Sequence, residues 1–352
     1  MERARESRRR RQLSRWFCRH LCLLGLLLVP ARAADFDSGR WTLIEDNDGE
    51  FSSQDRHYTQ GLQLSYLSSR LTPTSVIGRG ADCLGALLPG FRASAGSTRR
   101  FDIAIGQQIF TPEDIHQVPP DSNDRPYAGW LYAGFSLLQQ NHSNHLNELQ
   151  VQFGVVGPAA LGEQAQNGFH SLAGLRPADG WDSQLRNRGA IQLAYVYRRR
   201  IPLQLMHNYA FDAVPEAGFN IGSVLRYAEI GGLLRFGNAL AANYGPAHVQ
   251  PGLGGSDWFD ADALGGSFLH WSIFAGGQLR SVYYNRLIDG ARELVPDARI
   301  KARPFTFDAV AGGGLVLSPR VHLSLTATRR TGEFRGQKGF DLFGTALLSV
   351  AF

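Results

Sequence analysis

Val321-His322-Leu323-Ser324-Leu325-Thr326-Ala327 shows most clearly the pattern on which the predicted fold rests. Its odd-numbered positions are apolar, and its even-numbered positions are polar or small. A period of two is typical of a β-strand, because successive side chains point to opposite faces of a sheet. The chain ends with the same alternation, Leu348-Ser349-Val350-Ala351-Phe352. These two stretches therefore predict β-strands.

Similar segments recur along most of the chain and number twelve, which is an even number as bacterial single-chain barrels require. They are 40–46, 59–68, 100–110, 130–139, 146–156, 190–199, 206–222, 224–236, 268–284, 305–317, 321–330 and 341–352. Alternation that runs through to a terminal Phe is typical of barrels that face lipid outside and polar groups inside. The pattern predicts a twelve-stranded antiparallel transmembrane β-barrel.

The connections between these segments divide into short and long ones, which predicts one rim of tight turns and one rim of long loops. Residues 200–202 and 318–320 are predicted as tight turns. The Gly-, Pro- and Asp-rich stretch Gly245 to Gly266 is predicted as a flexible surface loop. The alternative fold is an exported soluble sandwich or propeller. The sequence has no repeat of about 40 residues, and this absence argues against a propeller.

Residues 1–33 have the pattern of a secretory signal peptide. A basic segment precedes an apolar run from Leu21 to Pro30, and Ala31-Arg32-Ala33 follows as the cleavage site. The apolar run of about ten residues is too short to span a bilayer. We therefore expect the mature protein to be residues 34–352, a single outer-membrane barrel domain.

Removing this segment changes the charge and the cysteine count of the chain. The segment holds nine Arg and two Glu, a net +7, so subtracting it from the formal +5 of the whole chain leaves −2. This balance gives no support to a nucleic-acid partner. Cys18 and Cys22 lie in the segment, so Cys83 remains alone and no intrachain disulfide is expected.

One stretch, Gly154 to Gln184, has a helical pattern. Pro158 suits a first helical turn, and Gly174 with Pro177 beyond it suits a helix end. Its polar residues at helical spacing are Glu163, Gln166, Asn167 and His170, and its apolar residues are Leu161, Ala165, Phe169 and Leu172. The pattern predicts one short helix between strands 5 and 6 that carries a histidine on its polar face. A surface helix without a function remains the alternative.

Two further polar clusters interrupt the strands at the first predicted hairpin. Residues 45–48 end the first strand and 55–61 open the second, so the clusters meet at one rim. Carboxylate, carboxamide and hydroxyl oxygens are ligands that Ca²⁺ accepts. A cation site and a solvated acidic loop both fit this composition.

Asp124-Arg125-Pro126-Tyr127 forms another polar cluster, which taken alone favours a capped turn with an Asp–Arg pair. The motifs of serine hydrolases, zincins and nucleotide-binding loops do not occur in the sequence.

Taken together, these clusters resemble the outer-membrane lipid A 3′-O-deacylase family. The matching pieces, in the family's order, are Asn47-Asp48, Tyr58-Thr59 with Gly61, Gln107, Thr111-Pro112, Asp124-Arg125, Gly154 to Pro158, Gln166-Asn167 with His170, Trp181, Gln184, Asn187 and Glu333-Phe334-Arg335. The resemblance covers nearly all of the chain after the leader, and it also implies a twelve-stranded barrel.

The resemblance implies Ca²⁺-dependent hydrolysis of the ester-linked acyl or acyloxyacyl chain at the 3′ position of lipid A. It implies catalytic roles for His170, Asn47, Asp48 and Thr59, with Asn47 and Asp48 holding the metal. We expect a mechanism like that of phospholipase A2, in which a neutral imidazole activates water. Lipopolysaccharide and outer-membrane lipids are the expected partners, and a monomer is expected.

The chain departs from the family pattern in two places. It has Ile115-His116-Gln117-Val118-Pro119 where a Lys-Arg pair is typical, and Arg176 where an acidic residue follows the histidine. We therefore assign substrate binding to Arg56, Arg125 and Gln166, because guanidinium groups bind phosphate as bidentate donors. A glycerophospholipid esterase and a porin-like barrel without activity are the alternative functions.

Overall fold

The computed structural model describes residues 39–48, 56–142, 144–205, 209–249, 255–264, 269–295 and 298–352. The predicted signal peptide lies outside these residues. The strands are β1 Arg40–Asn47, β2 His57–Leu67, β3 Thr98–Thr111, β4 Ala128–Asn141, β5 His145–Val156, β6 Arg188–Arg199, β7 Ile201–Leu205, β8 Ala210–Gly222, β9 Leu225–Gly237, β10 His270–Asn285, β11 Phe305–Ser318, β12 Val321–Thr331 and β13 Phe340–Ala351. The α-helices are α2 Val76–Leu87, α3 Gly162–Ala173 and α4 Arg286–Asp289, and the 3₁₀ turns are 89–91, 158–160, 181–183, 240–242, 261–263 and 290–293.

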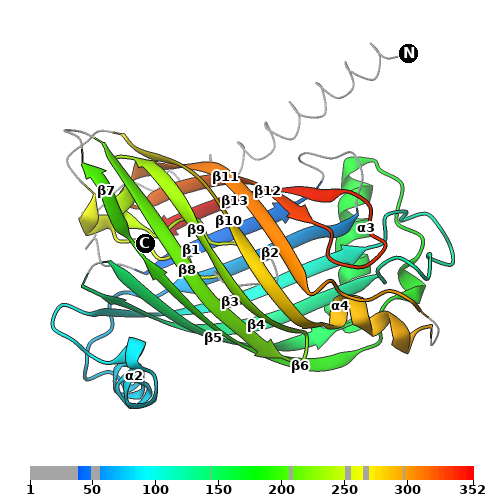
Figure 1. Ribbon diagram of the computed structural model, residues 1–352, viewed down its shortest axis with the longest axis horizontal. Coiled ribbons are helices and arrows are strands. Elements are labelled where there is room, and N and C mark those ends of the chain that lie inside the picture. Colours follow the sequence, from blue (N-terminus) through cyan, green and yellow to red (C-terminus); the bar gives the residue numbers. More distant parts are fainter. Residues whose placement is uncertain are drawn as a thin grey trace, which may run out of the picture. The chain divides into compact units, whose positions relative to one another are not determined.

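These strands form one closed antiparallel barrel (Figure 1). β1 pairs with both β2 and β13, and β6 pairs with β8 to close the wall. β6 and β7 are successive parts of one strand, since β6 pairs with Glu216 to Gly222 of β8 and β7 with Ala210 to Ala213. Within the described chain the wall therefore has twelve strands, as predicted, and closure excludes the sandwich alternative.

The two faces of the wall have opposite polarity, as β3 illustrates. Ile103 and Ile105 point outward with 52% and 57% of their surface exposed. Asp102 and Gln108 point inward and are buried. A soluble sandwich would bury the isoleucines, whereas a barrel in lipid exposes them to acyl chains.

The prediction of a tight turn at residues 200–202 is wrong. The strand continues through Pro202, which pairs with Asp212, and a register shift follows between Pro202 and Gln204. Proline lacks an amide donor, but a bulge near a strand end tolerates this loss. The described part of β8 accordingly begins at Ala210, four residues later than the predicted start at residue 206.

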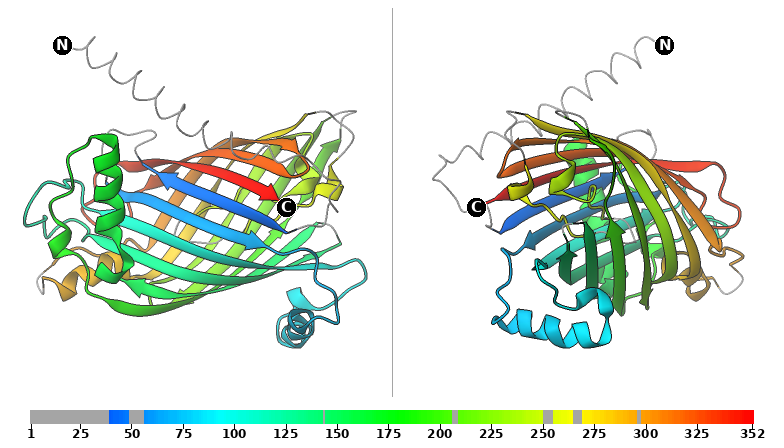
Figure 2. Two further views of the ribbon diagram at one scale, coloured as in Figure 1. Left: turned by 180° about the vertical axis from the view of Figure 1, so that it is seen from behind. Right: turned by 60° about the vertical axis from the view of Figure 1, so that its left-hand side comes forward.

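Long connections occur at both rims, so the prediction that one rim carries the tight turns is wrong. The rim that bears α3, called here the α3 rim, carries 112–127, 157–187, 286–304 and 332–339. The opposite rim, called the terminal rim because β13 ends there, carries the short connections 142–144 and 319–320 and also the long connections 68–97 and 238–269. Figure 2 shows α3 and α2 at these two rims.

The long connection between β9 and β10 enters the barrel, so the predicted surface loop at Gly245 to Gly266 is corrected for its described residues. Val249 packs with Ile44 and Leu347 of the inner wall. Trp258 lies with its ring 5.5 Å from the Arg100 guanidinium carbon and is 3% exposed. Apolar side chains spaced among the glycines decide this position, because they fill the interior of the barrel.

None of the helices in the described part of the chain is long and apolar enough to cross a bilayer.

Candidate active site

The predicted helix is present as α3, with one difference at its start. Pro158 begins a separate 3₁₀ turn, Pro158–Ala160, and Leu161 adopts a left-handed conformation (φ 59°) before α3 begins at Gly162. The helix ends at Ala173, with Gly174 as its C-cap, as the sequence predicts.

The polar face of α3 is its buried face. Gln166 and His170 are 2% and 4% exposed, whereas Phe169 and Leu172 are 39% and 79% exposed. This arrangement reverses that of a helix in a soluble protein, whose apolar stripe faces the core. α3 therefore turns its histidine toward the protein and its apolar side chains toward the surroundings.

The ring of His170 is oriented by a backbone carbonyl. Its Nδ1 lies 2.7 Å from the carbonyl oxygen of Arg176. A carbonyl only accepts hydrogen bonds, so Nδ1 carries the proton and the neutral ring has its lone pair on Nε2. The backbone carbonyl of Arg176 thus fixes the orientation of the imidazole.

Gly174 makes this contact possible by reversing the chain. At φ 70° it lets the amides of Gly174 and Leu175 donate to the carbonyls of Ser171 and His170, at 3.3 and 2.8 Å. The turn directs the next residue, Arg176, back over the helix end. L side chains rarely adopt this backbone conformation, whereas glycine does so without strain.

We expect Gly174→Val to loosen this turn, because a β-branched residue at positive φ is strained by about 1–3 kcal/mol. The amide of Leu175 should then exchange its hydrogen about tenfold faster or more, measured by hydrogen–deuterium exchange. Gly168→Ala is the control within the same helix, because its added Cβ meets open space. Unchanged exchange at Leu175 in the valine variant would contradict the proposed role of the turn.

The first hairpin presents Asn47 and Thr59 on the outer face of the wall at the same rim. Asp46 points inward, where its Oδ2 accepts a hydrogen bond from the Tyr58 hydroxyl at 2.7 Å, so Asn47 next to it points outward. Thr59 sits at a β-bulge, and its Oγ1 lies 2.7 Å from Oγ1 of Thr111 at the end of β3. Thr111 follows the inward-facing Phe110 and so shares the outer face with Thr59.

Asp48 joins the two sides of this hairpin. Its Oδ2 accepts a hydrogen bond from the Arg56 amide at 2.7 Å, and its own amide donates to the Thr59 carbonyl at 3.3 Å. Asp48 is 4% exposed. Arg56 is partly exposed, and its guanidinium lies 3.4 Å from Glu113 of the neighbouring loop.

The connection that carries α3 is fastened to this outer face. Gln107 of β3 donates from Nε2 to the Ala160 carbonyl at 2.6 Å. Ile109 of β3 is buried against Trp181 and Ala178. Gln166 in turn accepts a hydrogen bond from Trp181 Nε1 at 2.9 Å, so its contact is with the protein's own loop. α3 consequently lies beside β3 and β4 at this rim (Figure 2).

Arg125 is the site residue that the structure does not place with the others. It is fully buried over the inward-facing Phe110, 4.5 Å from the ring centre, and its Nη1 lies 3.2 Å from Glu333 Oε2. Burial lowers the pKa of its guanidinium, and the Glu333 carboxylate opposes that shift. The assignment of Arg125 to substrate binding has no support from this position.

Another buried polar group at the α3 rim was missed in the sequence. His57 Nδ1 lies 2.6 Å from Asp341 Oδ1, and the Gln337 amide donates to Asp341 Oδ2 at 2.8 Å. His57 opens β2 and Asp341 opens the last strand, so their contact depends on closure of the barrel. Only the position of His57 two residues before Thr59 could have drawn attention to it.

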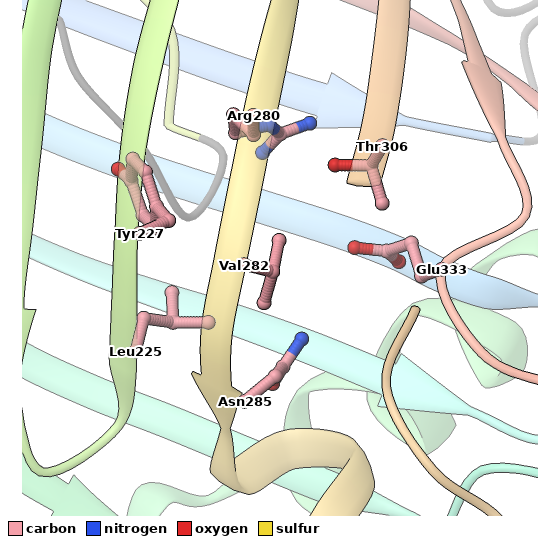
Figure 3. A pocket seen from close by; sticks show the side chains of 7 residues that line it. All are labelled: Leu225, Tyr227, Arg280, Val282, Asn285, Thr306 and Glu333. Atoms are coloured by element: carbon pink, nitrogen blue, oxygen red, sulfur yellow. The ribbon is translucent and has the colours of Figure 1, made fainter. Parts of the chain in front are cut away.

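A small cavity opens inside the barrel, on the other side of the wall from α3 (Figure 3). Its lining residues are Leu225, Tyr227, Arg280, Val282, Asn285, Thr306 and Glu333. None of the predicted catalytic residues lines it, so we place the candidate active site on the outer face.

The donor chemistry of Asn47, Asp48 and Thr59 at the α3 rim fits a hard cation such as Ca²⁺. Asn47, Asp48 and Thr59 offer carboxamide, carboxylate and hydroxyl oxygens, the ligand types that Ca²⁺ accepts. In the described ranges no group of three or more His, Cys, Asp or Glu side chains forms a metal cluster. The predicted metal ligands Asn47 and Asp48 therefore remain a hypothesis.

A closed barrel with an apolar outer face, a polar and filled interior and a polar site on its outer wall defines an integral outer-membrane protein. The model of the family described as "Outer membrane protein LpxR" matches residues 20–352. The chain belongs to this family, and the resemblance seen in the sequence is confirmed.

Among solved structures, LpxR from Salmonella typhimurium is similar with a TM-score of 0.70 and 18% identity, over 89% of this chain and 100% of that one. This likeness supports the fold. The β domain of the Bordetella autotransporter BrkA is similar with a TM-score of 0.44 and 9% identity, over 90% of this chain and 100% of that one. A search of curated proteins by sequence found no match.

Proposed function

We propose that this protein is a Ca²⁺-dependent lipid A 3′-O-deacylase of the outer membrane. The observation that carries the proposal is the His170 ring, which a backbone carbonyl holds in one tautomer on the buried face of α3. This face lies at the rim where Asn47, Asp48 and Thr59 gather. The proposal concerns hydrolysis of the ester that joins an acyl chain to the 3′ position of the sugar.

In the proposed reaction, His170 acts as the general base. Its Nε2 takes a proton from water, and the resulting hydroxide attacks the ester carbonyl carbon. The bond between that carbon and the sugar oxygen then breaks, and the sugar oxygen takes the proton back from the imidazolium. The products are a free fatty acid and lipid A with a free 3′ hydroxyl group.

Thr59 and the Asn47-Asp48 pair would stabilise the negative charge that develops on the carbonyl oxygen of the ester. The Thr59 hydroxyl lies on the outer face and can donate a hydrogen bond to the oxyanion. Asn47 and Asp48 would hold the cation. When bound there, Ca²⁺ polarises the ester carbonyl and stabilises negative charge on its oxygen.

The surroundings of α3 favour a substrate with acyl chains. Leu161 and Leu175 at the helix ends are 51% and 46% exposed, and Phe169 and Leu172 between them are also exposed. In a protein of the outer membrane, apolar side chains on the outer wall contact lipid. An ester of a membrane lipid would therefore reach His170 without leaving the bilayer.

The porin-like alternative has less support, because described residues of the 238–269 connection occupy the interior. Gln63 of β2 donates from Nε2 to the Gly255 carbonyl at 2.5 Å, and Gln108 of β3 hydrogen-bonds to the Val249 carbonyl. These contacts fill space that a pore would need.

The test is mass spectrometry of lipid A from bacteria with and without the protein. We expect loss of the 3′ chain when the protein is present. In purified protein, EDTA should abolish the reaction, Ca²⁺ should restore it, and Asp48→Asn should raise the Ca²⁺ concentration needed. Unchanged lipid A with newly released fatty acid from glycerophospholipid would instead support the esterase alternative. Full activity in EDTA would refute the metal assignment.

A further inference from the structure

At the terminal rim, α2 is a well-defined helix of 12 residues. Ser75 caps it, since its hydroxyl accepts a hydrogen bond from the Gly78 amide at 3.0 Å. The helix ends before Pro89, which cannot continue it. The strand pattern of the sequence did not predict this helix.

One side of α2 packs on the outer face of the wall. The strand residues that it meets are Leu137, Leu149 and Tyr195, which are paired across β4, β5 and β6 and therefore share one face. Leu138 beside Leu137 packs with Trp258 inside the barrel, so Leu137 points outward. Ala81 is buried in this contact, and Ile77 and Leu84 of the helix are partly buried in it.

Arg99 of β3 fixes the helix to the wall with four contacts, one of them from Nη1 to the Gly78 carbonyl of α2 at 3.3 Å. Its Nε donates to Gln139 Oε1 at 2.6 Å, and its Nη2 donates to the Phe91 carbonyl at 2.8 Å. Its Nη1 lies 2.6 Å from Asp82 Oδ1 of α2. The Arg99 guanidinium therefore holds α2 against the wall.

The side of α2 turned away from the wall is apolar and exposed. Val76, Gly80, Cys83 and Leu87 follow at i, i+4, i+7 and i+11, the spacing of one helical stripe. Val76 and Leu87 are 78% and 80% exposed, and Cys83 is exposed as well. We call these four residues the α2 stripe.

The polar residues of α2 occupy a separate sector. At about 100° per residue, Arg79 and Asp82 lie between the wall side and the α2 stripe. The helix thus presents the wall, an apolar stripe and a polar sector in turn. This is the division of an interfacial helix, which keeps one sector in water and one in lipid.

The direction of the helix agrees with this division. Figure 1 and the left view of Figure 2 show α2 nearly end-on, while the strands of the barrel run across the picture. The helix axis is therefore roughly perpendicular to the barrel axis, and so parallel to the membrane plane. The stripe points away from the wall, which is also the direction in which the lipid-facing side chains of the wall point.

We propose that α2 lies in the interface of the membrane leaflet at the terminal rim and inserts the α2 stripe among its lipids. The α2 stripe continues the lipid-facing surface of an outer-membrane barrel beyond the strand ends. The contacts of α2 with Arg99 and Leu137 determine how deep the helix lies in the membrane. The proposal concerns anchoring at the rim opposite α3 and does not depend on the enzymatic activity.

Cys83 provides the test, because it lies on the stripe. The full chain carrying Cys18→Ser and Cys22→Ser is labelled at Cys83 with an environment-sensitive fluorophore and reconstituted in phosphatidylglycerol and phosphatidylethanolamine vesicles. We expect a blue-shifted emission, quenching by lipids that carry a nitroxide on the acyl chain, and at least threefold weaker quenching by iodide than for the control. The control carries Cys83→Ser with Arg79→Cys, which places the label in the polar sector.

Folding of each variant is checked by its heat-dependent mobility in gel electrophoresis. Equal iodide quenching at the two sites, with no quenching by nitroxide lipids, would overturn the proposal. Efficient cross-linking of two chains through Cys83, again without lipid quenching, would also overturn it and would show that a second copy covers the stripe.

Discussion

His170→Ala is expected to reduce lipid A deacylation by about 10²–10⁴-fold, the usual contribution of a general base. The alanine side chain cannot take the proton from water, while Asn47, Asp48 and Thr59 remain in place. The measurement is the rate at which purified protein releases the 3′ chain from lipid A, followed by mass spectrometry at saturating Ca²⁺.

His116→Ala is the matched control for this experiment. His116 lies in the adjacent loop, 3.4 Å from Asp179, and its side chain is 35% exposed. We expect its loss to change the rate by less than threefold, an effect of about 0.7 kcal/mol or less. If His170→Ala kept the wild-type rate, or if both variants lost activity equally, the assignment of the base to His170 would be wrong.

Asp308→Ala is expected to destabilise the barrel by about 3–5 kcal/mol, because two buried guanidinium groups lose the carboxylate that they share. Asp308 is fully buried in the interior. Arg330 of β12 donates to it from Nε and Nη2, each at 2.9 Å, and Arg280 of β10 lies 2.6 Å away. This carboxylate therefore ties three neighbouring strands together.

The stability is measured by urea unfolding in lipid vesicles, with tryptophan fluorescence as the signal. Asp262→Ala is the control, because its pair with Arg70 is an ion pair with side chains 47% and 37% exposed. Such an exposed pair contributes about 0–1 kcal/mol. Equal destabilisation by the two substitutions would show that the interior ion pairs do not hold the wall.

The strands could be predicted because their pattern is local. Each of the twelve predicted segments overlaps a strand of the wall, since alternation of apolar and polar residues records which face meets lipid. The helix with His170 was predictable for the same reason, from spacing and from Gly174 at its end. The sequence did not indicate that Leu161 would separate Pro158 from the helix.

The errors concern segments whose position depends on distant parts of the chain. The stretch Gly245 to Gly266 has the composition of a surface loop, but Val249 and Trp258 find partners on strands up to about 200 residues away in sequence. Arg125 looked like a phosphate ligand beside the other clusters. Closure of the barrel places it instead against Phe110 and Glu333 on the inner side.

The closed antiparallel barrel, its strand number and the identity of the polar clusters could be predicted from the sequence alone, because period-two alternation and residue chemistry are local properties. Three features required the folded chain: the polar face of α3 is buried, the Arg176 carbonyl orients His170, and Thr59 meets Thr111 on the outer wall. Those contacts follow from strand register and from chain reversal at Gly174, which join residues that no local pattern connects.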